Sequence, residues 1–156
     1  MTIEERGDLA KSYFLKGYNC TQAVLLAFLD KIPLDEKEAL LLASSFGGGM
    51  GGMREVCGTV TGIFMVAGLL FGYVDPKAPQ EKKEHYSRIR ELADAFKKEN
   101  GSIICGQLLA GVPVPVSENE AQEGEKTVIL KKKPCPELVK MATKILDQYM
   151  VNNENV

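Results

Sequence analysis

Four cysteines, at positions 20, 57, 105 and 135, are the residues of this 156-residue chain best suited to chemistry. As thiolates they can attack disulfides, and they can also bind soft metal ions. No pair has the two-residue spacing that marks a zinc ribbon or a thioredoxin-like motif. Spacing alone therefore predicts neither a metal site nor a particular disulfide pairing.

The four cysteines share one local setting, which is the predicted start of a helix. Asn19, a good helix cap, precedes Cys20; glycine follows Cys57 and Cys105; and Pro136, typical of a first helical turn, makes Cys135 the expected N-cap. The free amides and the positive dipole end of a helix favour a thiolate over a thiol. We therefore expect the four sulfurs to form one site, within about the span of a disulfide or a metal cluster.

Three functional hypotheses follow from such a site. In the first, the protein exchanges disulfides with a redox partner protein or a small thiol, Cys57 has the lowest thiol pKa and acts as nucleophile, and a second cysteine resolves the mixed disulfide. In the second, Cys20, Cys57, Cys105 and Cys135 are the ligands of zinc or of an iron–sulfur cluster. In the third, the chain is a helical interaction module, such as a homodimer, and its cysteines fill the core.

One motif narrows these hypotheses by resemblance. The run Cys57-Gly58-Thr59-Val60-Thr61-Gly62, with the stretch around Cys20, with Cys105 and with the Cys-Pro pair at 135, resembles the C_GCAxxG_C_C family, whose members are described as redox-active. The resemblance covers most of the chain and implies a small helical protein that uses these four cysteines. A similar module occurs in split-Soret cytochromes, for which an iron–sulfur site has been proposed. The sequence departs from the family at Thr59, where alanine is usual.

The two glycines of this motif also have a physical reading. Gly58 and Gly62 are four residues apart, so they share one helix face and allow another helix to approach the Cys57 sulfur. Gly58 in addition leaves the backbone amides open to a bound group, which makes both glycines candidate cofactor contacts. Close helix packing is the simpler alternative, and the two roles are compatible.

The elements that must position the site are predicted to be helices. Capping signals at Thr2, Asn19 and Asp35 open the first three, with Gly17 and Pro33 closing the first two and the glycine run 47–52 following the third. An uncharged stretch between residues 55 and 75 predicts a buried, glycine-containing central helix rather than a membrane span. A long amphipathic helix, a short one near residue 105 and a final one from residue 135 complete the pattern. We expect an all-α, single-domain bundle of about five or six helices over residues 1–156, with a long loop at 111–134 that includes a brief strand at 127–130.

Composition limits the partners. A net charge of -2 gives no reason to expect nucleic acid. The acidic N-terminus lacks the features of a secretory signal, so we expect a cytoplasmic protein without membrane insertion, in which permanent disulfides are uncommon. The glycine run lacks the ending of a phosphate-binding loop, and the single histidine, His85, lies among charged residues of a helix surface.

Overall fold

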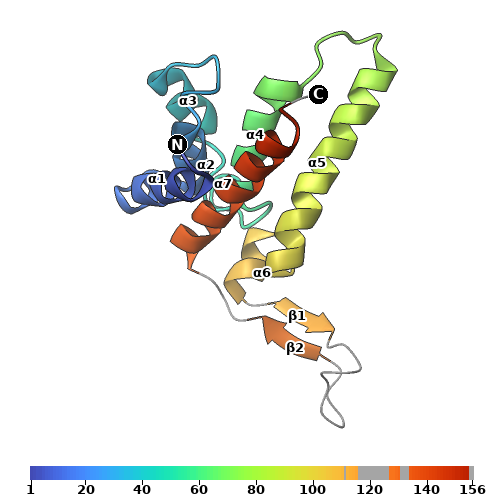
Figure 1. Ribbon diagram of the computed structural model, residues 1–156. Coiled ribbons are helices and arrows are strands. Elements are labelled where there is room, and N and C mark those ends of the chain that lie inside the picture. Colours follow the sequence, from blue (N-terminus) through green and yellow to red (C-terminus); the bar gives the residue numbers. More distant parts are fainter. Residues whose placement is uncertain (111, 116–126, 131–133, 155–156) are drawn as a thin grey trace.

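The chain folds into a helical bundle with a small appended hairpin (Figure 1). The computed structural model describes residues 1–110, 112–115, 127–130 and 134–154. Seven helices and two strands lie in these ranges: α1 (Ile3–Leu15), α2 (Cys20–Ala27), α3 (Glu36–Ala43), α4 (Gly58–Phe71), α5 (Pro79–Asn100), α6 (Cys105–Ala110), β1 (Val112–Pro115), β2 (Thr127–Leu130) and α7 (Cys135–Asn152). The predicted all-α class is confirmed, and the seven described helices are more than the five or six expected.

Local sequence signals determine where the first three helices begin. The side chains of Thr2, Asn19 and Asp35 each accept a hydrogen bond from the backbone amide three residues later. The side chain of that later residue in turn accepts a hydrogen bond from the backbone amide of the cap residue. These reciprocal bonds satisfy amides that the first turn of a helix would otherwise leave unpaired. All three predicted capping boxes are therefore present.

A contact from another helix ends α2 earlier than predicted. We expected this helix to continue to Pro33, but its last residue is Ala27. The carbonyl of Ala27 accepts a hydrogen bond from the guanidinium of Arg6, at 2.6 Å, while the amide of Lys31 donates to Phe28 instead. Arg6 is 3% exposed and also pairs with Asp30 and Asp147.

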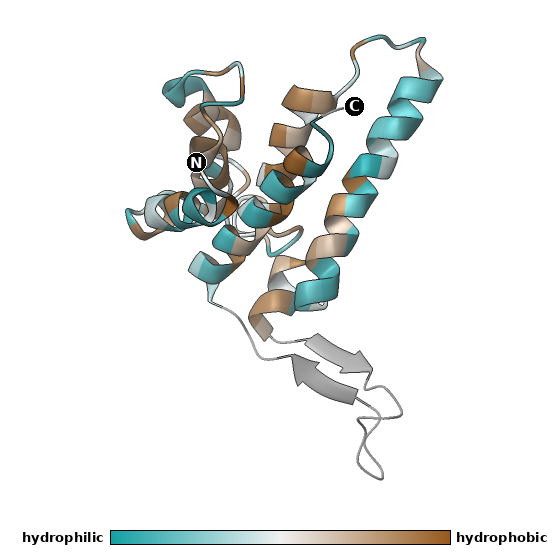
Figure 2. Cartoon of the chain, in the orientation of Figure 1, coloured by the Kyte–Doolittle hydropathy of each residue, from teal (hydrophilic) through white to brown (hydrophobic). Residues whose placement is uncertain are grey.

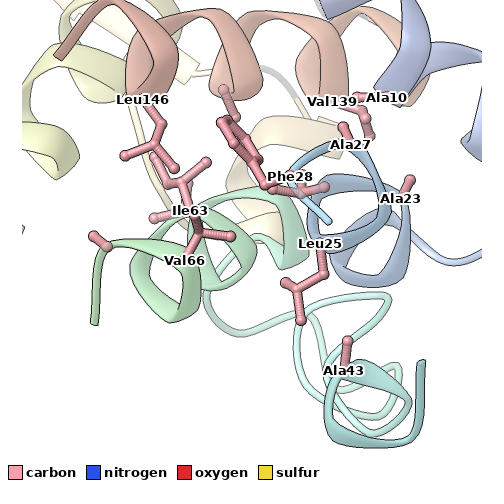
Figure 3. Packing of buried hydrophobic residues seen from close by; sticks show 14 of the residues in the cluster. Ala10, Ala23, Leu25, Ala27, Phe28, Ala43, Ile63, Val66, Val139 and Leu146 are labelled. Atoms are coloured by element: carbon pink, nitrogen blue, oxygen red, sulfur yellow. The ribbon is translucent and has the colours of Figure 1, made fainter. Parts of the chain in front are cut away.

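The central helix α4 is buried as predicted. Its first turns and one later face lie inside the molecule, and Figure 2 shows this helix as mainly hydrophobic. Side chains from α1, α2, α4 and α7 meet in the core, among them Phe28, Ile63 and Leu146 (Figure 3). Among the described helices, none has the length and apolar character needed to cross a membrane.

Helix α7 joins the parts of the bundle, since it packs against α1, α2, α4 and α5 (Figure 1). Its neighbour α5 carries a mainly hydrophilic surface (Figure 2). The C-cap of α5 is Gly101, which has the left-handed conformation (φ 83°) that glycine adopts without strain. In Figure 1, α5 lies on the side of α4 opposite to α3, and α7 crosses in front of α4.

The segment predicted as a loop contains a hairpin. Strand β1 pairs with β2 in antiparallel register, with Val112 opposite Leu130. The strand predicted at 127–130 is confirmed, and its partner was not predicted because two prolines in β1 argue against a strand interior. Of the rest of the predicted loop, residues 111, 116–126 and 131–133, which include the run Lys131 to Lys133, lie outside the described residues.

Candidate functional site

All four cysteines line a single pocket of about 240 Å³. They come from four different helices, and apolar side chains complete much of the wall: Phe14, Leu108, Leu109 and Leu138. No disulfide joins any two of the four cysteines; Cys57 is buried and the other three are half-buried. The fold thus brings together residues that the sequence separates widely, at the place where the starts of α2, α4, α6 and α7 converge.

Every cysteine lies at the start of a helix, as expected. Cys20, Cys105 and Cys135 are the first residues of α2, α6 and α7, and Cys57 is the N-cap of α4. One detail of the prediction is wrong: Pro134 is the N-cap of α7, and Cys135 is already inside the helix. Because Pro136 fits either of the first helical positions, its presence alone could not decide between these two registers.

Helices α2 and α4 approach closely enough to bring Cys20 beside the start of α4. The Thr21 hydroxyl donates a hydrogen bond of 2.9 Å to the carbonyl of Gly58. A β-carbon at Gly62 would be 2.9 Å from Cβ of Val24, so the second motif glycine also permits this packing. Gly58 lines the pocket, whereas Gly62 is not among its lining residues. The predicted close-packing role of both glycines is therefore present, and their role as cofactor contacts stays a prediction.

A short antiparallel bridge places Cys57 near Cys105. Val56 pairs with Ile104, the amide of Cys57 donates to the carbonyl of Ile103 at 2.7 Å, and the amide of Cys105 donates to the carbonyl of Glu55 at 2.6 Å. Cys57 comes directly after Val56, and Cys105 comes directly after Ile104. Because successive side chains of an extended segment point to opposite faces, both cysteine side chains lie on the face opposite to those of Val56 and Ile104. Cys57 and Cys105 are thus diagonal neighbours across the bridge. In regular sheets the Cα atoms of such neighbours are roughly 7–8 Å apart.

Burial dominates the acidity of Cys57. Its side chain is only 6% exposed, and desolvation raises the pKa of the thiol from 9.0 to about 11. Hydrogen bonds with the Thr59 hydroxyl, 3.1 Å from the sulfur, and with the backbone of Thr59 and Val60 lower the pKa by less than burial raises it. Backbone groups of the first helical turn do reach the sulfur, but the predicted lowering of the Cys57 pKa is wrong because the surrounding core excludes water.

Sequence reasoning missed the cation of this site, Arg54. Its Nη1 lies 3.8 Å from the Sγ of Cys105, and it lines the pocket. Arg54 belongs to the loop after the glycine run, and nothing in its local pattern separates it from an ordinary surface arginine. The only sequence signal was the glycine run itself, which indicates close backbone approach: a β-carbon at Gly49 would lie 2.6 Å from Cβ of Cys105.

The arrangement of donors does not form a metal cage within the part of the chain that the structure describes. There, no three cysteine, histidine or acidic side chains are grouped so that they could hold a metal ion. Four thiolates around zinc would each need to lie about 2.3 Å from one centre. The cysteines therefore share a pocket without fitting a four-thiolate metal centre in this conformation.

The comparisons with known proteins give one match. The family model described as "Putative redox-active protein (C_GCAxxG_C_C)" matches residues 18–149, a range that includes all four cysteines and the whole pocket wall except Phe14. Neither a curated protein nor a solved structure matches the chain.

Proposed function

This chain belongs to the C_GCAxxG_C_C family, whose members carry the description "Putative redox-active protein", and we propose that it carries out thiol–disulfide exchange at the pocket lined by its four cysteines. One observation carries the proposal: four half-buried or buried thiols from four helices line one apolar pocket. Cysteines that serve only as core residues need not converge, whereas exchange needs at least two thiols within reach of one substrate.

The reaction oxidises two cysteine thiols of the protein to one disulfide and reduces one substrate disulfide to two thiols. A cysteine thiolate attacks one sulfur of the substrate disulfide; the S–S bond breaks, and the first substrate thiolate leaves and takes a proton from water. A second cysteine of the pocket then attacks the mixed disulfide, which releases the second substrate thiol. The protein loses two electrons and two protons, and the substrate disulfide gains them.

The structure supports different roles for the cysteines. Cys57, with a pKa of about 11, is almost entirely a thiol at neutral pH, so it is a poor first nucleophile. The half-buried cysteines are better placed to meet a substrate first. We therefore assign the first attack to one of them and give Cys57, at the buried end, the role of a later partner within the protein.

The test uses the fully reduced protein and oxidised glutathione. We expect the number of protein thiols, counted after denaturation, to fall from four to two, with two equivalents of reduced glutathione formed for each intramolecular disulfide. Serine variants of each cysteine identify the pair, because loss of the attacking cysteine prevents mixed-disulfide formation and loss of the resolving cysteine makes the mixed disulfide accumulate.

Two results would contradict the proposal. If all four thiols survive at a glutathione potential that oxidises ordinary dithiols, the cysteines are structural and the interaction-module hypothesis gains. If the purified protein carries stoichiometric zinc or the visible absorbance of an iron–sulfur cluster, the thiols are ligands rather than exchange groups.

A further inference from the structure

The loop between α3 and α4 has an unusual backbone next to the pocket. Four glycines in it have positive φ angles between 58° and 77°, and so do two residues with side chains, Met50 (φ 65°) and Arg54 (φ 62°). The left-handed conformation is easy for glycine and unfavourable for any residue with a β-carbon. Such a conformation persists where the surrounding structure enforces it, and it is most common at functional sites.

Backbone hydrogen bonds hold Arg54 in this conformation. Its amide donates to the carbonyl of Gly48 at 3.1 Å, and its own carbonyl accepts from the amide of Gly106 at 3.0 Å. The second bond ties the loop to the residue that follows Cys105. The strained backbone therefore fixes the origin of the Arg54 side chain beside α6, and its guanidinium lies 3.8 Å from the Cys105 sulfur.

The charge at this position is local. The whole protein carries a net charge of -2, so its overall field does not attract anions. Arg54 is exposed, and within the described ranges no carboxylate forms an ion pair with it. A guanidinium has five N–H donors, so contact with one sulfur leaves others to bind a planar carboxylate.

We propose that Arg54 makes Cys105 the attacking thiol of the pocket and gives the site a preference for small disulfides that carry carboxylates. This inference rests on the proposed exchange function and names its first nucleophile and its substrate class. The guanidinium stabilises the Cys105 thiolate as it forms, and it orients a substrate carboxylate so that a disulfide sulfur faces Cys105. Attack breaks the substrate S–S bond and forms the Cys105 mixed disulfide, and the departing thiolate takes a proton from water.

The first test needs no disulfide substrate. Each cysteine of the reduced protein is alkylated with neutral iodoacetamide or anionic iodoacetate at pH 7, and labelling is followed by peptide mass spectrometry. We expect Arg54→Gln to slow iodoacetamide labelling of Cys105 by roughly fivefold, the factor for two unit charges about 4 Å apart in water. Labelling by iodoacetate falls further, because the anion also loses its attraction. Arg54→Lys restores much of both rates, and Arg90→Gln, which removes an exposed arginine of α5, changes neither.

A glycine variant separates charge from folding. Arg54→Gly removes the guanidinium but relieves the left-handed strain, so we expect its melting temperature to rise by about 2–4 °C while Cys105 labelling stays as slow as in Arg54→Gln. If Arg54→Gln and Arg54→Gly leave the labelling of Cys105 at the wild-type rate, or slow all cysteines equally, Arg54 does not act on Cys105 and the inference is wrong.

The second test addresses the substrate class. The wild-type protein should react faster with oxidised glutathione, which carries carboxylates, than with the cationic disulfide cystamine, and Arg54→Gln should remove most of this preference. An unchanged preference would overturn the substrate assignment. If the wild-type protein reacts with neither disulfide while its Cys105 labelling still depends on Arg54, the proposed exchange function fails and the charge effect on Cys105 stands.

Discussion

Gly58 of α4 lies directly against the Cys20 side chain of α2, since a β-carbon at Gly58 would be 2.2 Å from the Cys20 Sγ and 2.7 Å from the Thr21 hydroxyl. Gly58→Ala must therefore push the two helices apart or displace Cys20. We expect a loss of about 1–3 kcal/mol in the free energy of unfolding, measured with urea, and faster alkylation of Cys20.

Gly68 provides a matched control in the same helix. A β-carbon there would meet nothing within 4 Å. Alanine has the higher helix propensity, so Gly68→Ala should stabilise the protein by up to ~1 kcal/mol. Equal effects of the two substitutions would show that helix propensity, rather than the contact with Cys20, governs position 58.

The raised pKa of Cys57 predicts a specific loss of stability at alkaline pH. Between pH 9 and 11 the unfolded state releases the thiol proton while the folded state keeps it, so the folded state binds more protons and stability falls as pH rises. The contribution of the protonated Cys57 thiol to the free energy of unfolding is fully present below pH 9. It is lost as the pH rises to 11, which lowers the free energy of unfolding by about 2–3 kcal/mol. Cys57→Ala should therefore show a shallower decline over this range in urea unfolding under reducing conditions.

The control for this prediction is Val60→Ala, a truncation of a fully buried residue in the same helix. Its destabilisation should be the same at pH 8 and pH 11, because no titrating group is removed. If the free energy of unfolding declines between pH 9 and 11 as steeply in Cys57→Ala as in the wild-type protein, the pKa of Cys57 is not near 11.

The hydroxyl of Thr59 lies 3.1 Å from the Cys57 sulfur. This hydrogen bond lowers the Cys57 pKa, so Thr59→Val should raise the pKa further. We expect slower alkylation of Cys57 at pH 9–10, by about twofold to thirteenfold for a hydrogen bond of 0.5–1.5 kcal/mol. Thr59→Ser keeps the hydroxyl and should retain the wild-type rate.

Thr61→Val is the matched control for that experiment. The Thr61 hydroxyl is buried and, within the described residues, has no hydrogen-bond partner. Its removal should leave Cys57 alkylation unchanged and stabilise the protein by about 1–3 kcal/mol, since a buried unsatisfied group is lost. A slower Cys57 reaction in both variants would point to altered packing of α4 rather than to the Thr59 hydroxyl.

Arg6 is a buried charge that links α1 to Asp30, just after α2, and to Asp147 of α7. It bonds to Asp147 at 3.2 Å and to Asp30 at 2.6 Å, and its guanidinium also lies over the Phe28 ring. Arg6→Leu leaves Asp147 buried without its cation, and we expect a cost of about 3–5 kcal/mol in urea unfolding. Adding Asp147→Leu should recover part of this loss.

Lys140 offers the comparison, because it pairs with two exposed acidic residues, Glu4 and Asp8. Lys140→Gln should cost less than about 1 kcal/mol. If Arg6→Leu is no more costly than Lys140→Gln, the buried ion pair of Arg6 and Asp147 contributes little to the free energy of unfolding.

Much of the helical framework follows from short-range sequence rules. The capping boxes at Thr2, Asn19 and Asp35 involve residues three positions apart, so their hydrogen bonds form wherever the local helix forms. The same locality explains why each cysteine could be assigned to a helix start, and why the uncharged stretch around α4 could be recognised as the centre of the bundle. The sequence by itself thus determined the class of fold and the residues most suited to a common site.

The tertiary structure alone decided how those residues behave. Water is excluded from Cys57 by side chains of other helices, so the helix-start argument predicted the wrong direction for its pKa. Arg54 reaches Cys105 across 51 positions of the chain, and Arg6 ends α2 from 21 residues away. Desolvation and long-range contacts depend on how the helices pack, and no local pattern of residues contains that information.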